Sequence, residues 1–166
     1  MINPNRNFLL QNLKKMISIP SINPFGVHEP GKPAEGQIAD YFENCLLKLG
    51  LKTNSHIVSN GRKNVWGVLK GKGIGPTILL AGHLDTVGVE GYKDPFIPRI
   101  KGDRIYGRGA CDMKGGLAAF LETIRILIKA KISINGDIII AGVVDEENAM
   151  VGSNILDNMV LRLISR

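Results

Sequence analysis

Three short clusters of polar residues have the types and spacing needed to bind metal ions and move protons. The first is His83 with Asp85, which ends the apolar run LLAGHLD. The second is Asp112 in the glycine-rich stretch YGRGACDMKGG, and the third is DEEN at residues 145–148. Each follows a predicted strand or precedes a predicted helix, where open α/β sheets place their ligands. One imidazole with several carboxylates suits a divalent metal ion, with zinc favoured and manganese or cobalt as alternatives.

The pair His83 and Asp85 fits a metal ligand and its supporting group. Residues i and i+2 of an extended chain point to the same side. His83 could therefore bind a metal while the Asp85 carboxylate accepts the other imidazole N–H, which fixes the tautomer and makes a better ligand. Taken alone, the pair is more often a strand-end histidine that an aspartate caps. The other clusters are needed to decide.

The carboxylates of the other two clusters also have structural interpretations. Asp112 stands just before a long predicted helix and could be no more than its N-cap. The three acids at 145–147 repel one another unless they are solvated or neutralised, and an acidic loop tip is common. In the functional interpretation, Glu146 and Glu147 diverge from a strand end, so that one holds a metal and the other takes a proton from a water. The surplus of acids favours two metal ions that share a bridging carboxylate.

Cysteine ligands, disulfide bonds and a glycine-rich phosphate-binding loop are further possibilities, and the sequence disfavours each of them. Cys45 lies on the apolar face of a predicted helix, and Cys111 is expected to be a small buried residue rather than a ligand. Two cysteines cannot form a disulfide framework, and no CxxC is present. GKGIG at 71–75 precedes a strand rather than a helix and does not match GxxxxGK[ST], so nucleotide binding is set aside.

The bulk properties exclude other classes. With 166 residues, 44% of them hydrophobic, the chain is long enough for one domain with a core. A net charge of +6 invites nucleic-acid binding, but scattered Lys and Arg and few aromatic residues favour a solvated basic surface. No run approaches about 18 apolar residues, and the N-terminus has no long apolar leader segment. We expect no nucleic-acid partner, no membrane span and a cytoplasmic setting.

Helices that alternate with buried strands predict the frame that positions the clusters. Apolar residues at helical spacing predict helices over 6–17, 34–49, 113–131 and 150–162, with Gly50 ending the second. Strands are predicted over 51–58, 64–70, 77–83 and in GDIIIAGVVDEE, whose continuous apolar run is typical of burial on both faces. FIPRIKGDRIYGRG predicts a hairpin that turns at Gly102 and Asp103. The sum is an α/β fold, a layered sheet with helices on both faces.

Together these motifs resemble one known family. GHLDTV, DPF, GDRIYGRGACDMKGG, and DEEN followed by GS are similar, in this order and at these separations, to the zinc aminoacylase family. This family includes acetylornithine deacetylase, succinyl-diaminopimelate desuccinylase, glutamate carboxypeptidases and related dipeptidases. The resemblance extends over about residues 5–155, is clearest over 76–153, and implies a zinc-peptidase-like catalytic domain.

The resemblance implies a role for each residue. His83 would bind one metal ion, Asp85 would orient it, and Asp112 would bridge two metal ions and precede a cis peptide bond. Glu147 would bind the other metal ion, and Glu146 would be the general base. The implied reaction is hydrolysis of an amide bond in an N-acyl amino acid or peptide, in which Glu146 takes a proton from the activated water and delivers it to the leaving amine. DMKG in place of DDKG leans toward deacylation of acyl amino acids.

The sequence also departs from the family pattern. That pattern requires a further carboxylate after the Glu pair, a late histidine, and an inserted dimerisation or lid domain, for which these 166 residues hold no counterpart. His28 and His56 lie outside the motifs, and MVLRLISR after Asn158 no longer resembles the family. We therefore expect an N-terminal portion of a catalytic domain that is marginally stable or self-associating and inactive alone, whereas complete members are often homodimers. The sequence leaves open a catalytically incompetent chain with a partial metal site, and a dipeptidase or carboxypeptidase of the same family.

Overall fold

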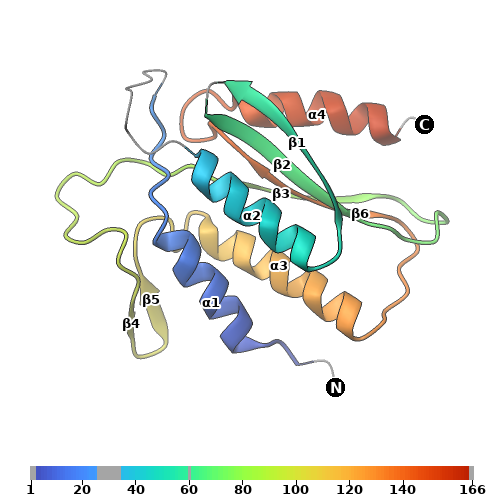
Figure 1. Cartoon of the computed structure of the whole chain (residues 1–166), viewed down its shortest axis with the longest axis horizontal. Helices are drawn as coiled ribbons and strands as arrows, with labels where there is room; N and C mark the ends of the chain where they lie inside the picture. Colours follow the sequence, from blue (N-terminus) through green and yellow to red (C-terminus); the bar gives the residue numbers. More distant parts are fainter. Residues whose placement is uncertain (1–2, 26–34, 60, 165–166) are drawn as a thin grey trace.

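The computed structural model describes residues 3–25, 35–59 and 61–164, which form helices packed on a mixed sheet (Figure 1). The helices are α1 (Arg6–Ile17), α2 (Gly36–Lys48), α3 (Lys114–Lys129) and α4 (Val151–Ile164). The strands of the sheet are β1 (Lys52–Ser59), β2 (Arg62–Leu69), β3 (Ile78–His83) and β6 (Ile138–Val143). A separate hairpin pairs β4 (Arg99–Lys101) with β5 (Arg104–Tyr106), as predicted. Part of the loop predicted before the second helix, including His28, lies outside the described residues.

The sheet places the ends of two strands side by side. Its strand order is β1-β2-β6-β3, with β3 parallel to β6 and the other neighbouring pairs antiparallel. In the parallel pair His83 lies opposite Val143, and the N–H of Leu84 donates to the Val143 carbonyl at 2.8 Å. The segments that follow β3 and β6 therefore leave the sheet at the same end.

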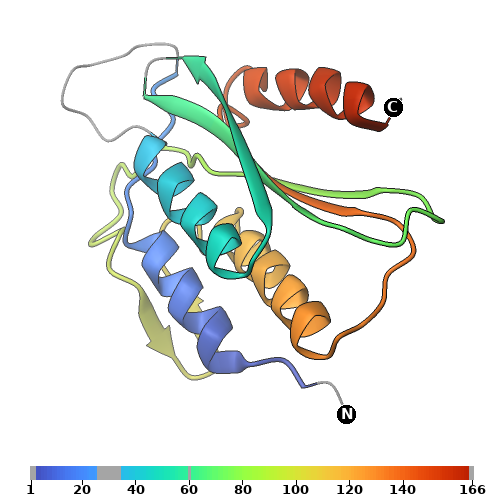
Figure 2. The ribbon, with the colours of Figure 1, turned by 45° about the vertical axis from the view of Figure 1, so that its right-hand side comes forward.

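Helices cover both faces of the sheet, as predicted (Figure 2). The larger core cluster joins α1, α2 and α3 to one face, and Phe42 and Leu117 are completely buried in it. On the other face, Leu156 of α4 packs with Trp66 and Ile139. Strand β6 contributes Ile140 to the first cluster and Ile139 to the second, which confirms that its apolar run is buried on both faces.

Local sequence signals explain where several elements begin and end. The Asn5 side chain caps α1 by accepting the N–H of Phe8 at 3.0 Å. Gly50, with φ 83°, follows α2 in the left-handed conformation that glycine adopts without a steric penalty. Gly102, with φ 62°, serves the hairpin turn in the same way. Near the end of α3, Ile128 is 36% exposed. In the described part of the chain, no helix is long and apolar enough to cross a membrane.

Candidate metal centre

Three predicted ligands converge at the end of the sheet where β3 and β6 both terminate. His83 is the last residue of β3, Glu147 follows β6, and Asp112 precedes α3. One ligand atom from each lies within 4.8 Å of the others. The His83 Nε2 is 2.9 Å from the Asp112 Oδ1 and 3.8 Å from the Glu146 Oε2. Because ligands of one zinc ion each lie about 2.0–2.2 Å from it, this spacing is close to what a bound ion requires.

The imidazole of His83 is held through its other nitrogen, although not by the group we expected. Its Nδ1 is 2.9 Å from the main-chain carbonyl oxygen of Asp85, and 3.7 Å from the Asp85 carboxylate. A carbonyl oxygen can only accept a hydrogen bond, so Nδ1 carries the proton and Nε2 faces Asp112. The imidazole N–H is thus bonded to the Asp85 backbone rather than to its carboxylate, and an orienting role for Asp85 stays a prediction.

The Asp85 carboxylate forms its hydrogen bonds with other groups, which explains why the His83 imidazole is bonded to the Asp85 main chain instead. It accepts the Asn23 side-chain amide at 2.6 Å and the main-chain N–H groups of Glu146 and Glu147 at 3.2 and 3.0 Å. Asp85 is completely buried, and both of its oxygens accept hydrogen bonds from these three donors. This carboxylate therefore ties the segment after β3, which carries His83, to the segment after β6, which carries both glutamates.

Asp112 is positioned by a turn and does not cap the helix that follows it. Helix α3 begins at Lys114 and has no side-chain cap, while Asp112 directs a carboxylate oxygen to His83. The peptide bond between Asp112 and Met113 is cis, as the family resemblance implied. Cys111 is exposed, contrary to expectation. The buried positions of this turn are occupied instead by Gly109 and Lys114, which pack on each other, while the half-buried Met113 packs on Gly82.

The charges of this cluster are unbalanced. Burial raises the pKa of Glu147, and repulsion from Asp112, Asp85 and Glu146 raises it further, against the opposing effect of His83. Burial alone would lower the pKa of His83, but the hydrogen bonds to Asp112 and Asp85 and the nearby acids outweigh it and raise the pKa. Within the described part of the chain, four carboxylates thus lie around one imidazole. A divalent cation would relieve this repulsion, and a donor set of one imidazole and carboxylates fits zinc.

The structure also reveals residues that the sequence did not single out. Arg62, at the start of β2, donates from Nε and Nη2 to both carboxylate oxygens of Glu35 at 2.6 and 2.7 Å, and from Nη2 to Asp145 at 2.8 Å. Asp145 is 2% exposed, so the first of the three acids is not part of a solvated loop tip, whereas Glu146 and Glu147 are half-buried. Nothing near Glu35 or Arg62 in the sequence marks them, because their partners are distant in the chain.

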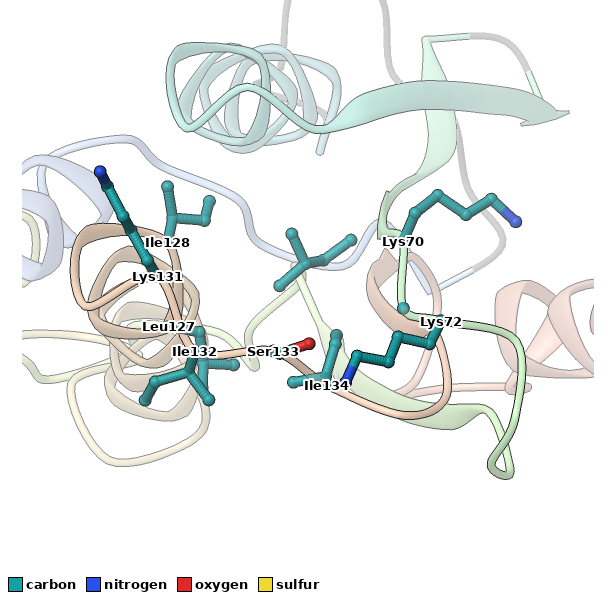
Figure 3. A pocket seen from close by; sticks show the side chains of 10 residues that line it. Lys70, Lys72, Leu127, Ile128, Lys131, Ile132, Ser133 and Ile134 are labelled. Carbon is teal, nitrogen blue, oxygen red and sulfur yellow. The ribbon is translucent and has the colours of Figure 1, made fainter.

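A groove of about 270 Å³ lies at the opposite end of the sheet (Figure 3). It is lined by Leu69, Lys70, Gly71, Lys72, Leu127, Ile128, Lys131, Ile132, Ser133 and Ile134. None of these residues is an acid, a histidine or a cysteine. In the adjoining GKGIG segment, the N–H of Gly71 donates to Asp137 and those of Lys72 and Ile74 to carbonyl groups. These three main-chain donors are therefore already used and would not serve a phosphate.

Comparison with known proteins agrees with this geometry. The profile of peptidase family M20/M25/M40 matches residues 79–162. The chain is 32% identical over 158 residues to N-formyl-4-amino-5-aminomethyl-2-methylpyrimidine deformylase of Bacillus subtilis (strain 168), covering 92% of this chain and 36% of that protein. It is 40% identical over 124 residues to a putative [LysW]-lysine/[LysW]-ornithine hydrolase of Pyrococcus abyssi, covering 74% and 31%. This chain spans about a third of the length of these curated relatives.

Solved structures show the same fold. A tripeptidase from Staphylococcus aureus superposes with a TM-score of 0.72 at 25% identity, over 91% of this chain and 39% of that one. The dipeptidase Dug1p from Saccharomyces cerevisiae superposes with a TM-score of 0.74 at 18% identity, over 89% and 34%. The segment that matches the family profile contains all three clusters, which confirms the resemblance seen in the motifs: the chain belongs to peptidase family M20/M25/M40.

Proposed function

We propose that this chain contributes the main part of the metal site of a zinc-dependent hydrolase that cleaves amide bonds in N-acyl amino acids or small peptides. The observation that carries the proposal is the convergence of His83, Asp112 and Glu147 within 4.8 Å, at the end of the sheet where two parallel strands terminate. A catalytic zinc ion has three protein ligands and an open position. In the arrangement that the family resemblance implies, His83 and Asp112 would supply two such ligands to one ion, and Asp112 and Glu147 would supply two to a second ion.

The residues of this chain divide the work between holding the metal and moving a proton. His83 would bind through Nε2, with Asp112 and Glu147 supplying carboxylate oxygens. The Asp112 side chain is 74% exposed, which leaves room for it to bridge to a second ion. When bound, the metal supplies Lewis-acid activation of a water and of the substrate carbonyl. The Glu146 carboxylate, 3.8 Å from the imidazole, would take a proton from the attacking water and pass it to the leaving amine.

The names of the relatives support the substrate class. Two of them are a deformylase and a succinyl-diaminopimelate desuccinylase, the latter 35% identical over 96 residues. Both names describe removal of an acyl group, which favours N-acyl amino acids or related amides as substrates.

Both cysteines are free, and Cys111 is exposed. Free cysteines favour a reducing compartment such as the cytoplasm. A dipeptidase is the second candidate, because the fold matches a dipeptidase and a tripeptidase.

Zinc titration of the metal-free chain by calorimetry tests the metal site directly. We expect His83→Ala, Asp112→Asn and Glu147→Gln each to weaken zinc binding by at least about 10–100-fold. Asp103→Asn, which removes an exposed acid at the hairpin turn, is the matched control and should bind like the wild type. Unchanged affinity in the Asp112 and Glu147 variants would contradict the assignment. Zinc-loaded protein should then be assayed with N-acyl amino acids and dipeptides in parallel, to separate the two substrate classes.

A further inference from the structure

A buried ion cluster lies beneath the acidic segment that follows β6. The guanidinium of Arg62 donates hydrogen bonds to both carboxylate oxygens of Glu35, at 2.6 and 2.7 Å, and to one carboxylate oxygen of Asp145, at 2.8 Å. The three side chains are 11%, 0% and 3% exposed. Burial of two carboxylates and one cation is costly and is tolerated only with good geometry. The cluster joins the residue before α2, the start of β2 and the end of β6, which are far apart in the sequence.

Asp145 is held by its backbone as well as by its side chain. It has φ 69°, a left-handed conformation that is uncommon for residues other than glycine. Its N–H is 3.3 Å from a Glu35 oxygen, and its carbonyl accepts the N–H of Met150 at 2.7 Å. A strained backbone persists only where its surroundings determine it strongly. Arg62 and Glu35 provide these surroundings.

The turn at Asp145 leads directly into the candidate metal site. After this residue the chain presents the N–H groups of Glu146 and Glu147 to the Asp85 carboxylate. Asn23 links Asp85 to Asp145, because its side-chain amide is 2.6 Å from the Asp85 carboxylate and 3.4 Å from the Asp145 carboxylate. A displacement of Asp145 would therefore move the two glutamates that follow it.

We propose that Arg62 is a positioning residue for the metal centre: its guanidinium, oriented by Glu35, holds Asp145 and so sets where the carboxylates of Glu146 and Glu147 lie. The proposal rests on the proposed function, in which Glu147 binds the metal. Only a planar fork can bind both oxygens of one carboxylate and reach a second carboxylate. A lysine at position 62 would keep the charge but lose this geometry.

The chain contains a matched control pair. Arg125 donates to both oxygens of Glu122 at 2.5 and 2.7 Å, with side chains 12% and 4% exposed. Glu122 also accepts a third hydrogen bond, from the N–H of Asn5 at 2.6 Å. This pair has nearly the same geometry and burial as Arg62 with Glu35. It lies within α3 and does not contact the segment after β6, so loss of its guanidinium fork tests stability without touching the candidate site.

Hydrogen–deuterium exchange of the metal-free chain is the first test. Arg62→Lys should speed exchange across residues 144–152 by about 10-fold or more, since the amides of Glu146 and Glu147 lose their fixed orientation toward Asp85. Arg125→Lys should leave this segment unchanged, even where the two variants lose similar thermal stability. Should Arg62→Lys fail to fold, Glu35→Gln gives the same readout with one buried charge fewer, and is expected to loosen the segment in the same way.

Cobalt titration, followed by the visible absorption of bound Co²⁺, is the second test. Arg62→Lys should weaken Co²⁺ binding by about 10–100-fold, the usual effect of losing a group that orients a ligand, and should alter the band shape. Arg125→Lys should match the wild type in both. Equal exchange rates over 144–152 and equal Co²⁺ affinity in the two variants would overturn the proposal. A wild-type chain that binds no Co²⁺ would refute the proposed function, while the exchange comparison would still decide whether Arg62 holds the segment.

Discussion

The two ends of the central sheet both gather charged side chains, but they balance those charges differently. At the end formed by the N-termini of β3 and β6, the Asp137 carboxylate is neutralised by Lys70 at 2.7 Å and by the N–H of Gly71 at 2.9 Å. At the opposite end, among the described residues, the acids Asp112, Glu146 and Glu147 lie close to one base, His83. The first end uses its acid to close a turn, whereas the second leaves negative charge uncompensated.

This difference shows which property identifies a functional site in such a fold. Polar residues occur at both ends, and the groove with its lysines lies at the end away from His83 (Figure 3). The converging ligand atoms and the surplus of carboxylates occur only where β3 and β6 terminate, among the described residues. Charge imbalance in a partly buried, convergent arrangement is costly for folding, and it is the arrangement expected of residues that bind a cation.

The largest expected effect concerns catalysis at the metal end. In a catalytically active form of the enzyme, Glu146→Gln should reduce kcat by about 10²–10⁴-fold, because it removes the proposed general base. Metal content, measured by atomic absorption, should stay unchanged. Lys131→Gln at the far groove, a substitution of similar size, should leave kcat within about 2-fold. Near-normal turnover in the Glu146 variant would show that another group accepts the proton.

Two glycines, one at each end of the sheet, allow the effect of close backbone packing on metal binding to be compared between the two ends. A Cβ at Gly152 would collide with the Val144 carbonyl oxygen, and a Cβ at Gly136 would collide with the Pro76 carbonyl oxygen. Gly152→Ala and Gly136→Ala should each destabilise the chain by about 1–3 kcal/mol, measured by urea denaturation. Only Gly152→Ala should also weaken zinc binding, since it displaces the segment that carries the glutamates. A loss of zinc affinity in both variants would mean that the two ends are coupled.

A smaller effect, on stability, is expected for Glu147→Gln. Most substitutions destabilise a protein, whereas this one should stabilise the metal-free chain. Without metal, this variant should be more stable than the wild type by about 0.5–2 kcal/mol, because one of several mutually repelling carboxylates is removed. With saturating zinc the order should reverse, since the variant has lost a ligand. Thermal denaturation with and without zinc measures both states. A variant that is less stable in both would indicate that Glu147 is a structural residue.

The smallest effect concerns acid stability at the far end. The hydrogen bonds from Lys70 and from the N–H of Gly71 lower the pKa of Asp137. Because this pKa is lower in the folded chain, the stability it contributes is present above the unfolded value of about 3.9 and is lost as the pH falls through the folded value. Asp137→Asn should thus cost about 0.5–1 kcal/mol at pH 7, and this cost should shrink as the pH falls below the unfolded value. A difference that persists in acid would mean that the Asp137 contribution is not ionic.

Much of the frame follows from local sequence. The helix predicted over 6–17 is α1 (Arg6–Ile17), and the strand predicted over 77–83 is β3 (Ile78–His83). These elements depend on side-chain periodicity and on nearby caps and glycines, which act within a few residues. The same local periodicity predicted that His83 and Glu147 lie at strand ends, and the resemblance to the family motifs singled out Asp112 as a ligand. The sequence alone therefore determined the elements and the residues of the candidate metal centre.

Other features were decided only when distant segments packed together. The ion cluster of Glu35, Arg62 and Asp145, the choice of the Asp85 carbonyl rather than its carboxylate as the partner of His83, and the exposure of Cys111 all depend on tertiary contacts. The partners in the ion cluster are separated by 27 and 83 residues, and Asp85 meets the glutamate segment across 61. Hydrogen bonds and desolvation act over a few ångströms in space, whereas sequence periodicity reports only neighbours along the chain. Only the packed sheet therefore determines which carboxylates are neutralised and which remain free to bind a cation.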